Sequence, residues 1–144
     1  MNYLEQLFSL NDRVSVVTGG ARGNGKAIAE ALLKAGSTVV LCDILESDLK
    51  RTMKSFQSEG LDARMYLCDL SKSVQIKGFV EWLRKEFRSV DILVNNAGVT
   101  FPQNILEYSE ENWDKTYQTN LRAPFILSQE ISRIMVEKAS GVIL

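Results

Sequence analysis

The sequence has 144 residues, the length of one ordinary domain, and its apolar share of 45% and charged share of 24% are those of a soluble globular protein. Seventeen basic and eighteen acidic residues leave a net charge of −1, so nothing in this balance favours nucleic acid as a partner. Histidine is absent, which excludes a Ser-His-Asp triad, a Cys-His pair and a histidine metal ligand.

Cysteine usage and hydropathy exclude further classes. Cys42 and Cys68 are too few for a metal cluster or a disulfide framework, and each ends an apolar run, where we expect a small buried thiol. No apolar run approaches the roughly 20 residues that a membrane span needs, and the first residues lack a basic targeting segment. We therefore expect a cytoplasmic protein that binds neither a membrane nor a metal.

Apolar runs and helical stretches alternate along the first half of the chain. The run 14–17 precedes a glycine-rich turn and a helix that Gly36 closes as its C-cap. The face of this helix expected to be buried consists of Ile28, Ala31, Leu32 and Ala35. The run 38–41 precedes a second helix, which ends at Gly60. Its expected inward residues are Leu49, Met53 and Phe56.

The same alternation continues in the second half. The run 63–67 leads to a helix with Ser71 or Ser73 as its N-cap. The apolar stripe of that helix consists of Ile76, Phe79, Val80, Leu83 and Phe87. The run 92–94 is followed by an irregular stretch and by a long helix from about residue 109 to 137.

Short connections between these elements predict right-handed βαβ units and a doubly wound parallel sheet. The fold class is α/β, a Rossmann-type sheet between two helical layers, and residues 1–144 form one domain. Residues 141–144 open a fifth apolar strand and stop inside it. Since an unfinished edge strand invites aggregation, we interpret the domain as C-terminally incomplete, truncated within the fifth strand.

A glycine-rich loop lies between the first strand and the first helix, at residues 18–25. Gly19 allows a tight turn, Gly23 lets the backbone approach a pyrophosphate, and Gly25 brings the helix against the strand. The free N–H groups and the dipole of the helix N-terminus also favour phosphate. The loop is therefore predicted to bind the phosphates of a dinucleotide.

The loop has a competing interpretation as a Walker A motif. Residues 20–26 read G-x-x-x-x-G-K, but Ala27 stands where a serine or threonine would hold Mg²⁺. Asp43 follows Gly25 by 18 residues, the spacing of an acid that binds the adenosine ribose. Its charge would repel a 2′-phosphate, whereas Arg22 could pair with one, so NAD is favoured and NADP is less favoured.

Several spaced motifs together resemble those of the classical short-chain dehydrogenases/reductases. In chain order they are Thr18-Gly19-x-x-x-Gly23-x-Gly25, Asp69, Asn95-Asn96-Ala97-Gly98 and Asn120, and the resemblance runs from about residue 11 onward. It implies an NAD(P)(H)-dependent oxidoreductase that interconverts an alcohol and a carbonyl. The small-molecule substrate would be a polyol, a sugar acid or a 3-oxoacyl compound, and the full-length protein would be a homotetramer or a dimer.

The resemblance also implies residue roles. Asp69 corresponds to the acid that contacts adenine, with a helix-capping aspartate as the structural alternative. Asn24 stands where the family usually has an apolar residue, and the stretch 99–105 is expected along the substrate pocket. Asn120 corresponds to the asparagine of the catalytic tetrad. The cofactor-binding candidates are Thr18, Gly19, Arg22, Gly23, Asn24, Gly25, Asp43, Cys68, Asp69, Leu70, Asn95, Asn96, Ala97 and Gly98.

Pro124 lies four residues after Asn120 and has no N–H to donate to the Asn120 carbonyl. The resemblance implies that this carbonyl binds a water in a proton relay, and a plain helix kink is the alternative. The family's catalysis also needs a serine after the fifth strand and a Tyr-x-x-x-Lys pair.

None of the four tyrosines has a lysine four positions later. The residues at those positions are Leu7, Leu70, Asn112 and Leu121. Ser140 precedes the fifth strand and cannot be the catalytic serine. We expect the 144 residues alone to be inactive, and a non-catalytic nucleotide-binding module and an NTPase remain as alternatives.

Overall fold

The structure, a computed structural model, describes residues 2–144 apart from the side chain of Glu5. Its middle layer is a five-stranded parallel sheet in the order β3-β2-β1-β4-β5. The strands are β1 Val14–Thr18, β2 Thr38–Asp43, β3 Ala63–Leu67, β4 Ile92–Val94 and β5 Val142–Ile143. The order reverses between β1 and β4, so the predicted doubly wound, Rossmann-type fold is confirmed.

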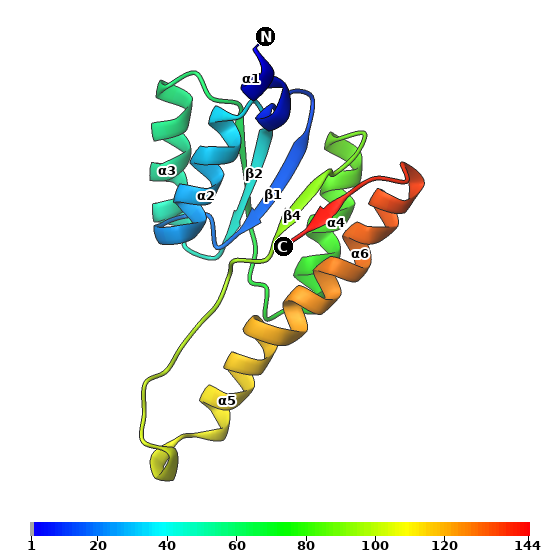
Figure 1. The fold of residues 1–144 in the computed structure, drawn as a ribbon. Coiled ribbons are helices and arrows are strands. Elements are labelled where there is room, and N and C mark those ends of the chain that lie inside the picture. Colours follow the sequence, from blue (N-terminus) through cyan, green and yellow to red (C-terminus); the bar gives the residue numbers. More distant parts are fainter. Residues whose placement is uncertain (1) are drawn as a thin grey trace.

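Helices cover both faces of the sheet (Figure 1). On one face lie α2 Gly23–Lys34 and α3 Glu46–Ser58, and on the other lie α4 Ser73–Glu86 and α6 Ala123–Glu137. Side chains alternate between the faces along each strand, so Val16 joins the core under α4 and α6 while Val17 joins the core under α2 and α3. Both neighbours are fully buried, which explains the continuous apolar runs in the sequence.

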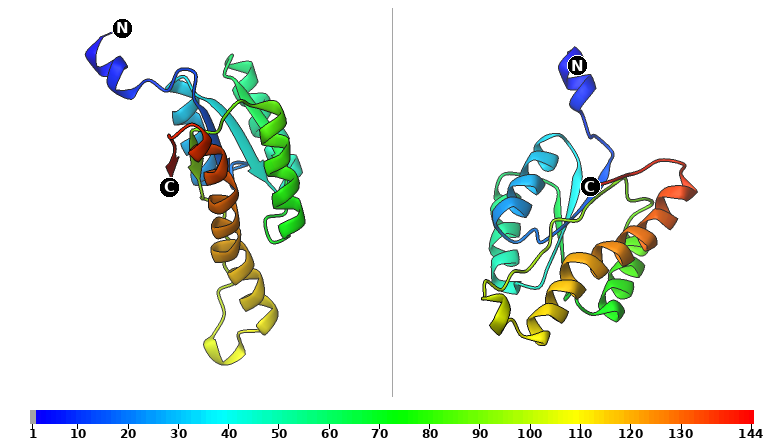
Figure 2. Two further views of the ribbon diagram at one scale, coloured as in Figure 1. Left: turned by 90° about the vertical axis from the view of Figure 1, so that its right-hand side faces the viewer. Right: turned by 60° about the horizontal axis from the view of Figure 1, so that its bottom comes forward.

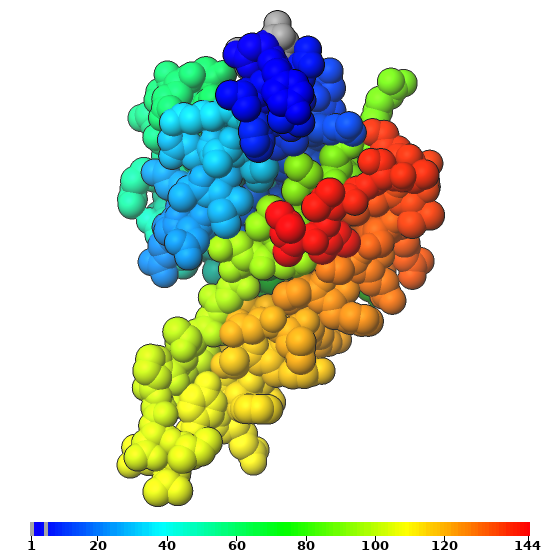
Figure 3. Space-filling view, viewed as in Figure 1, coloured from blue at the N-terminus to red at the C-terminus, as the bar shows by residue number. Residues whose placement is uncertain are grey.

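The remaining helical segments lie outside the layered body. Helix α1 Tyr3–Phe8 lies at the N-terminal end, and η1 Ile105–Glu107 precedes α5 Glu110–Tyr117. A π-helical turn, Gln118–Arg122, joins α5 to α6. The predicted long helix therefore runs over the expected range, with Ser109 as its N-cap. Figures 2 and 3 show that its first part projects beyond the sheet as an arm.

One local prediction is wrong in part and a second is wrong. The buried face of α2 is centred on Gly25, Ala29 and Leu33, with Gly25 against the Gly19 carbonyl. Of the predicted face, Ile28 and Leu32 are partly buried and pack against the same core, whereas Ala31 is exposed. The other error concerns α4, whose N-cap position is Lys72. Ser71 instead donates from its N–H and Oγ to Asp69 Oδ1, and Ser73 is already the first helical residue.

Asp91 joins three strands at their amino ends. Its Oδ2 accepts from the Val14 N–H at 2.9 Å, its Oδ1 accepts from Arg13 Nη1 at 3.0 Å, and Lys138 Nζ lies 3.8 Å away. Its carbonyl accepts from the Val142 N–H. Burial alone would raise the pKa of Asp91, but the bonds from Val14 and Arg13 and the charge of Lys138 outweigh it and lower the pKa.

Asp91→Asn should lower the free energy of unfolding by about 1–3 kcal/mol at pH 7, because the charge-assisted bonds are lost. The carboxylate has a lowered pKa in the folded state, so its stabilisation is present above about pH 4 and is lost as the pH falls through the folded pKa. Urea unfolding at pH 7 and pH 3 measures both effects. Asp12→Asn, at an exposed position, is the control; an equal loss in both variants would contradict the prediction.

Candidate functional site

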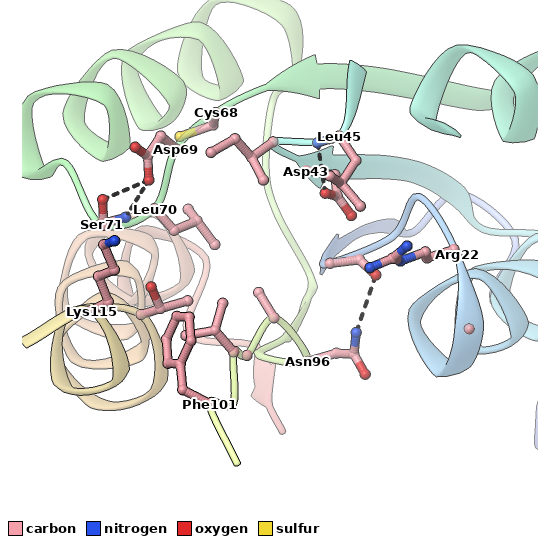
Figure 4. Close-up of a pocket in the computed structure, with 17 residues that line it drawn as sticks. Arg22, Asp43, Leu45, Cys68, Asp69, Leu70, Ser71, Asn96, Phe101 and Lys115 are labelled. Atoms are coloured by element: carbon pink, nitrogen blue, oxygen red, sulfur yellow. Dashed lines mark hydrogen bonds between the residues drawn. The ribbon is translucent and has the colours of Figure 1, made fainter. Parts of the chain in front are cut away.

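A cavity of about 560 Å³ opens at the carboxyl ends of β1, β2, β3 and β4, where the strand order reverses (Figure 4). Ligands of doubly wound sheets bind at this switch point. The lining residues are Gly19, Arg22, Gly23, Asp43, Ile44, Leu45, Cys68, Asp69, Leu70, Ser71, Asn96, Ala97, Gly98, Val99, Phe101, Lys115 and Thr119. The cavity thus brings together most of the sequence-predicted cofactor residues.

Five sequence-predicted residues do not line this cavity: Thr18, Asn24, Gly25, Asn95 and Asn120. Sequence reasoning in turn missed Ile44, Leu45, Ser71, Lys115 and Thr119. The first three are chain neighbours of Asp43 and Asp69. The other two, Lys115 and Thr119, are four residues apart on one face of the helical arm that leads to Asn120, and no local pattern places that face at the cavity.

The glycine loop uses its glycines in two different ways. A Cβ on Gly25 would lie 2.0 Å from the Gly19 carbonyl oxygen, so only glycine lets α2 approach β1 this closely. Gly23 has a φ of +56°, and a Cβ there would meet no described atom within 4 Å. Since Gly23 lines the cavity, its missing side chain leaves room for a ligand rather than for protein.

Helix α2 begins at the cavity with a free positive end. Arg22 occupies its N-cap position in extended backbone, no described side chain caps the helix, and its first turn contains no acidic residue. The unpaired N–H groups and the helix dipole therefore favour an anion at this end of the cavity.

Asp43 ends β2 at the cavity wall and is held by backbone amides. Its Oδ2 accepts from the Ala21 N–H at 2.9 Å, and its Oδ1 accepts from the Leu45 N–H at 3.0 Å. Both bonds orient the carboxylate, and each oxygen keeps a lone pair for a hydroxyl donor.

Asp69 lies on the opposite side of the cavity from Asp43 (Figure 4). Its Oδ1 accepts from the Ser71 N–H and Oγ, and its own N–H donates to Gln75 Oε1 at 2.8 Å. Asp69 therefore does not cap α4, which was the structural alternative; it caps the turn that precedes α4. Among the described residues Oδ2 has no hydrogen-bond partner, so it can accept from a ligand.

Of the two cysteines, Cys68 lines this side of the cavity and Cys42 lies behind it in the core. Both are free and buried, as the sequence predicted. The interaction with Cys68 and complete burial raise the pKa of the Cys42 thiol well above its usual range, so Cys42 stays protonated and unreactive.

Thr18 and Asn96 fasten the ends of β1 and β4 together. Thr18 Oγ1 accepts from the N–H groups of Asn96 and Ala97, both at 3.0 Å, and donates to the Val94 carbonyl at 3.3 Å. Asn96 Nδ2 donates to the carbonyls of Thr18 and Gly19 at 3.0 and 3.2 Å. Thr18 is itself buried, and through these bonds it positions the turn at Asn96 and Ala97 that lines the cavity.

Asn120 positions the other wall. Its Oδ1 accepts from the Val99 N–H and its Nδ2 donates to the Val99 carbonyl, both at 2.8 Å. The residue lies in the π-helical turn, directly before α6 with Pro124 in its first turn. The helix continues through this site without a break, because the wider turn accommodates the proline. The Asn120 carbonyl lacks the donor that residue 124 would otherwise provide.

The parallel sheet, the glycine loop and the cavity at the switch point define a protein of Rossmann type. Residues 13–144 match the short chain dehydrogenase family, so the chain belongs to the short-chain dehydrogenases/reductases. The resemblance drawn from the sequence motifs is thereby confirmed. Members of this family bind NAD(P).

Curated relatives include sugar-acid and polyol enzymes. The chain is 38% identical over 141 residues to the 2-dehydro-3-deoxy-D-gluconate 5-dehydrogenase of Pseudoalteromonas atlantica, covering 95% of this chain and 54% of that protein. It is 37% identical over 137 residues to the NAD-dependent glycerol dehydrogenase of Listeria innocua, covering 95% and 53%. The chain thus spans about half the length of the curated relatives it matches.

Solved structures show the same fold. A gluconate 5-dehydrogenase from Burkholderia cenocepacia J2315, in complex with NADP and tartrate, has a TM-score of 0.89 to this chain at 27% identity. The match covers 98% of this chain and 55% of that one.

Thr18→Val should lower the free energy of unfolding by about 1–3 kcal/mol, because two part-buried N–H groups, of Asn96 and Ala97, lose their acceptor while the shape of the side chain is kept. Urea unfolding measures the change. Thr38→Val is the control, because it makes the same substitution but removes only an exposed hydrogen bond to Asp62. The free energy of unfolding should change there by no more than about 0.5 kcal/mol. Similar losses in the two variants would contradict the role given to Thr18.

Gly25→Ala and Gly23→Ala should separate the two uses of glycine in the loop. Gly25→Ala should cost about 3 kcal/mol or more, because its Cβ overlaps the Gly19 carbonyl and Asn96 Nδ2. Gly23→Ala should cost only about 1–2 kcal/mol, the strain of a positive φ. Urea unfolding of both variants tests the order, and the reverse order would contradict it.

Proposed function

We propose that residues 1–144 are the coenzyme-binding part of an NAD(P)(H)-dependent oxidoreductase that interconverts an alcohol and a carbonyl. The observation that carries the proposal is the cavity at the switch point, where an uncapped helix N-terminus faces the anchored carboxylate of Asp43. Membership of the short-chain dehydrogenase family supports it.

The residues of the cavity fit a dinucleotide from one end to the other. The amides beside Gly23 would hold the pyrophosphate, Asp43 would accept from the adenosine ribose, and Asp69 Oδ2 would accept from the adenine amine. The turn formed by Asn96 and Ala97 would line the path to the nicotinamide. When bound, the coenzyme supplies hydride transfer.

We propose NAD(H) as the preferred coenzyme. Asp43 would be both a partner for the 2′-hydroxyl and a like charge to a 2′-phosphate. The relative from Listeria innocua is named as NAD-dependent, whereas the gluconate 5-dehydrogenase from Burkholderia cenocepacia was solved with NADP.

The proposed substrate is a polyol or a sugar acid, the classes named in the relatives' descriptions. Val99 and Phe101 line the cavity beyond the predicted nicotinamide path, so they are the proposed contacts of this chain with the substrate. Asn120 would help by holding the Val99 backbone through its side chain and by leaving its carbonyl for a water. The serine and the Tyr-x-x-x-Lys pair of the family are not among the 144 residues.

The exposed face of the helical arm suggests self-association. Trp113, Tyr117, Leu121 and Phe125 recur every four residues and are 49–64% exposed. We propose that a second copy of the full-length protein covers this face, and that the protein is cytoplasmic. Within residues 2–144 none of the helices has the length and apolar character to cross a membrane.

The 144-residue chain should bind NADH and should not oxidise D-gluconate, galactitol or glycerol with NAD⁺. NADH fluorescence titration measures binding, and absorbance at the nicotinamide band measures turnover. Gly23→Ala should weaken NADH binding about tenfold or more, because its methyl group occupies the space kept for the pyrophosphate. Thr38→Val, which lies away from the cavity wall, should bind like the unmodified chain.

Two outcomes would contradict this prediction. Tight Mg²⁺-dependent ATP binding without NADH binding would favour the NTPase alternative. Turnover by the 144 residues would show that a residue other than a tyrosine–lysine pair performs the proton transfer.

A further inference from the structure

Three acidic side chains lie at the end of β2 and in the first turn of α3, and their partners differ; of the three, only Asp43 lines the cavity. Glu46 accepts from Lys50 at 2.5 Å, on the surface of α3. Asp48 pairs with two arginines, described below. Asp43 accepts only backbone N–H groups among the described contacts, so its charge has no cationic partner in the described residues.

Asp48 lies beside the arginine that lines the cavity. Its Oδ2 lies 4.0 Å from Arg22 Nη1, and its Oδ1 lies 3.1 Å from Arg51 Nη1. Asp48 is only 27% exposed, whereas the two guanidinium groups are 74% and 78% exposed and can move. The Asp48 carboxylate therefore lies within ion-pair distance of both arginines, near the end of the cavity proposed for the ribose.

A buried frame fixes the backbone of the loop directly before Arg22. The residue before it, Ala21, donates its N–H to Asp43 Oδ2 at 2.9 Å, and its carbonyl accepts from Thr52 Oγ1 at 2.7 Å. Thr52 is buried and lies one helical turn after Asp48 on α3. Because the loop is tied to the end of β2 through Asp43 and to α3 through Thr52, buried contacts place the backbone of Arg22 near the first turn of α3, which contains Asp48.

We propose that Asp48 is a coenzyme-selectivity residue that acts through Arg22. By pairing with Arg22 and Arg51 it withholds both guanidinium groups from a 2′-phosphate, and its own charge adds to the repulsion from Asp43. It thereby disfavours NADP(H) without touching NAD(H). This inference rests on the proposed function, because it concerns the same coenzyme cavity.

The test compares NADH and NADPH binding to Asp48→Asn by fluorescence titration at low salt. The affinity for NADPH should rise about fivefold or more, while the affinity for NADH should stay within about twofold. The gain should shrink at about 0.5 M salt, since exposed charges are screened there. Asp48→Ser, which removes the same charge with a smaller side chain, should give the same shift.

Two further variants serve as controls. Glu46→Gln removes a carboxylate charge from the same first turn of α3, but its partner is Lys50, so NADPH affinity should change less than about twofold. Arg22→Gln combined with Asp48→Asn should remove most of the gain, because Arg22 is the one of the two released arginines that lines the cavity. Cooperative thermal unfolding checks that each variant is folded.

The outcomes separate the inference from the proposed function. An unchanged NADPH affinity in Asp48→Asn, an equal rise for both coenzymes, or an equal effect of Glu46→Gln overturns the role of Asp48. If the folded, unmodified chain binds neither NADH nor NADPH, the proposed function itself fails and the inference falls with it.

Discussion

The structure depends on the hydrogen bonds that fasten Thr18 to Asn96. Thr18 Oγ1 accepts two backbone N–H groups, from Asn96 and Ala97, and the Asn96 amide donates back to the carbonyls of Thr18 and Gly19. These bonds join the ends of β1 and β4, the two strands between which the sheet order reverses. Without these bonds the turn after β4 would not be held against the glycine loop, and the base of the cavity would lose its shape.

The ribose end of the cavity has a second buried frame. Ala21 lies between Asp43 and Thr52 and gives its N–H to one and its carbonyl to the other. The glycine loop is therefore fixed to β4 through Asn96 and to α3 through Thr52. Such a loop keeps its N–H groups aimed at the cavity before any ligand arrives, which is the preorganisation that tight binding of a charged group needs.

The sequence was sufficient for the fold because its main signals are local. Apolar runs, helical periodicity and the glycine loop define βαβ units, and handedness then leaves few topologies. The sequence was insufficient where a contact between distant segments decides which face of a helix is buried or where a helix begins. The buried face of α2 includes Gly25, which packs against the Gly19 carbonyl, and the turn before α4 is held by the bonds from Ser71 to Asp69. Apolar periodicity encodes neither contact. The same limit explains why Lys115 and Thr119 were missed, since only the docking of the arm brings them to the cavity.

The two ends of the cavity are held by different interactions, and this difference bears on function. The ribose and phosphate end rests on buried strands and on backbone bonds to Asp43 and Thr18, which form within the layered body. The opposite wall rests on two bonds between Asn120 and Val99, both exposed, on an arm that projects from that body. The contacts proposed for the ribose and the phosphates therefore lie within the layered body of these 144 residues. The proposed substrate contact Val99 depends instead on the position of the arm, because Asn120 on that arm makes both of these bonds.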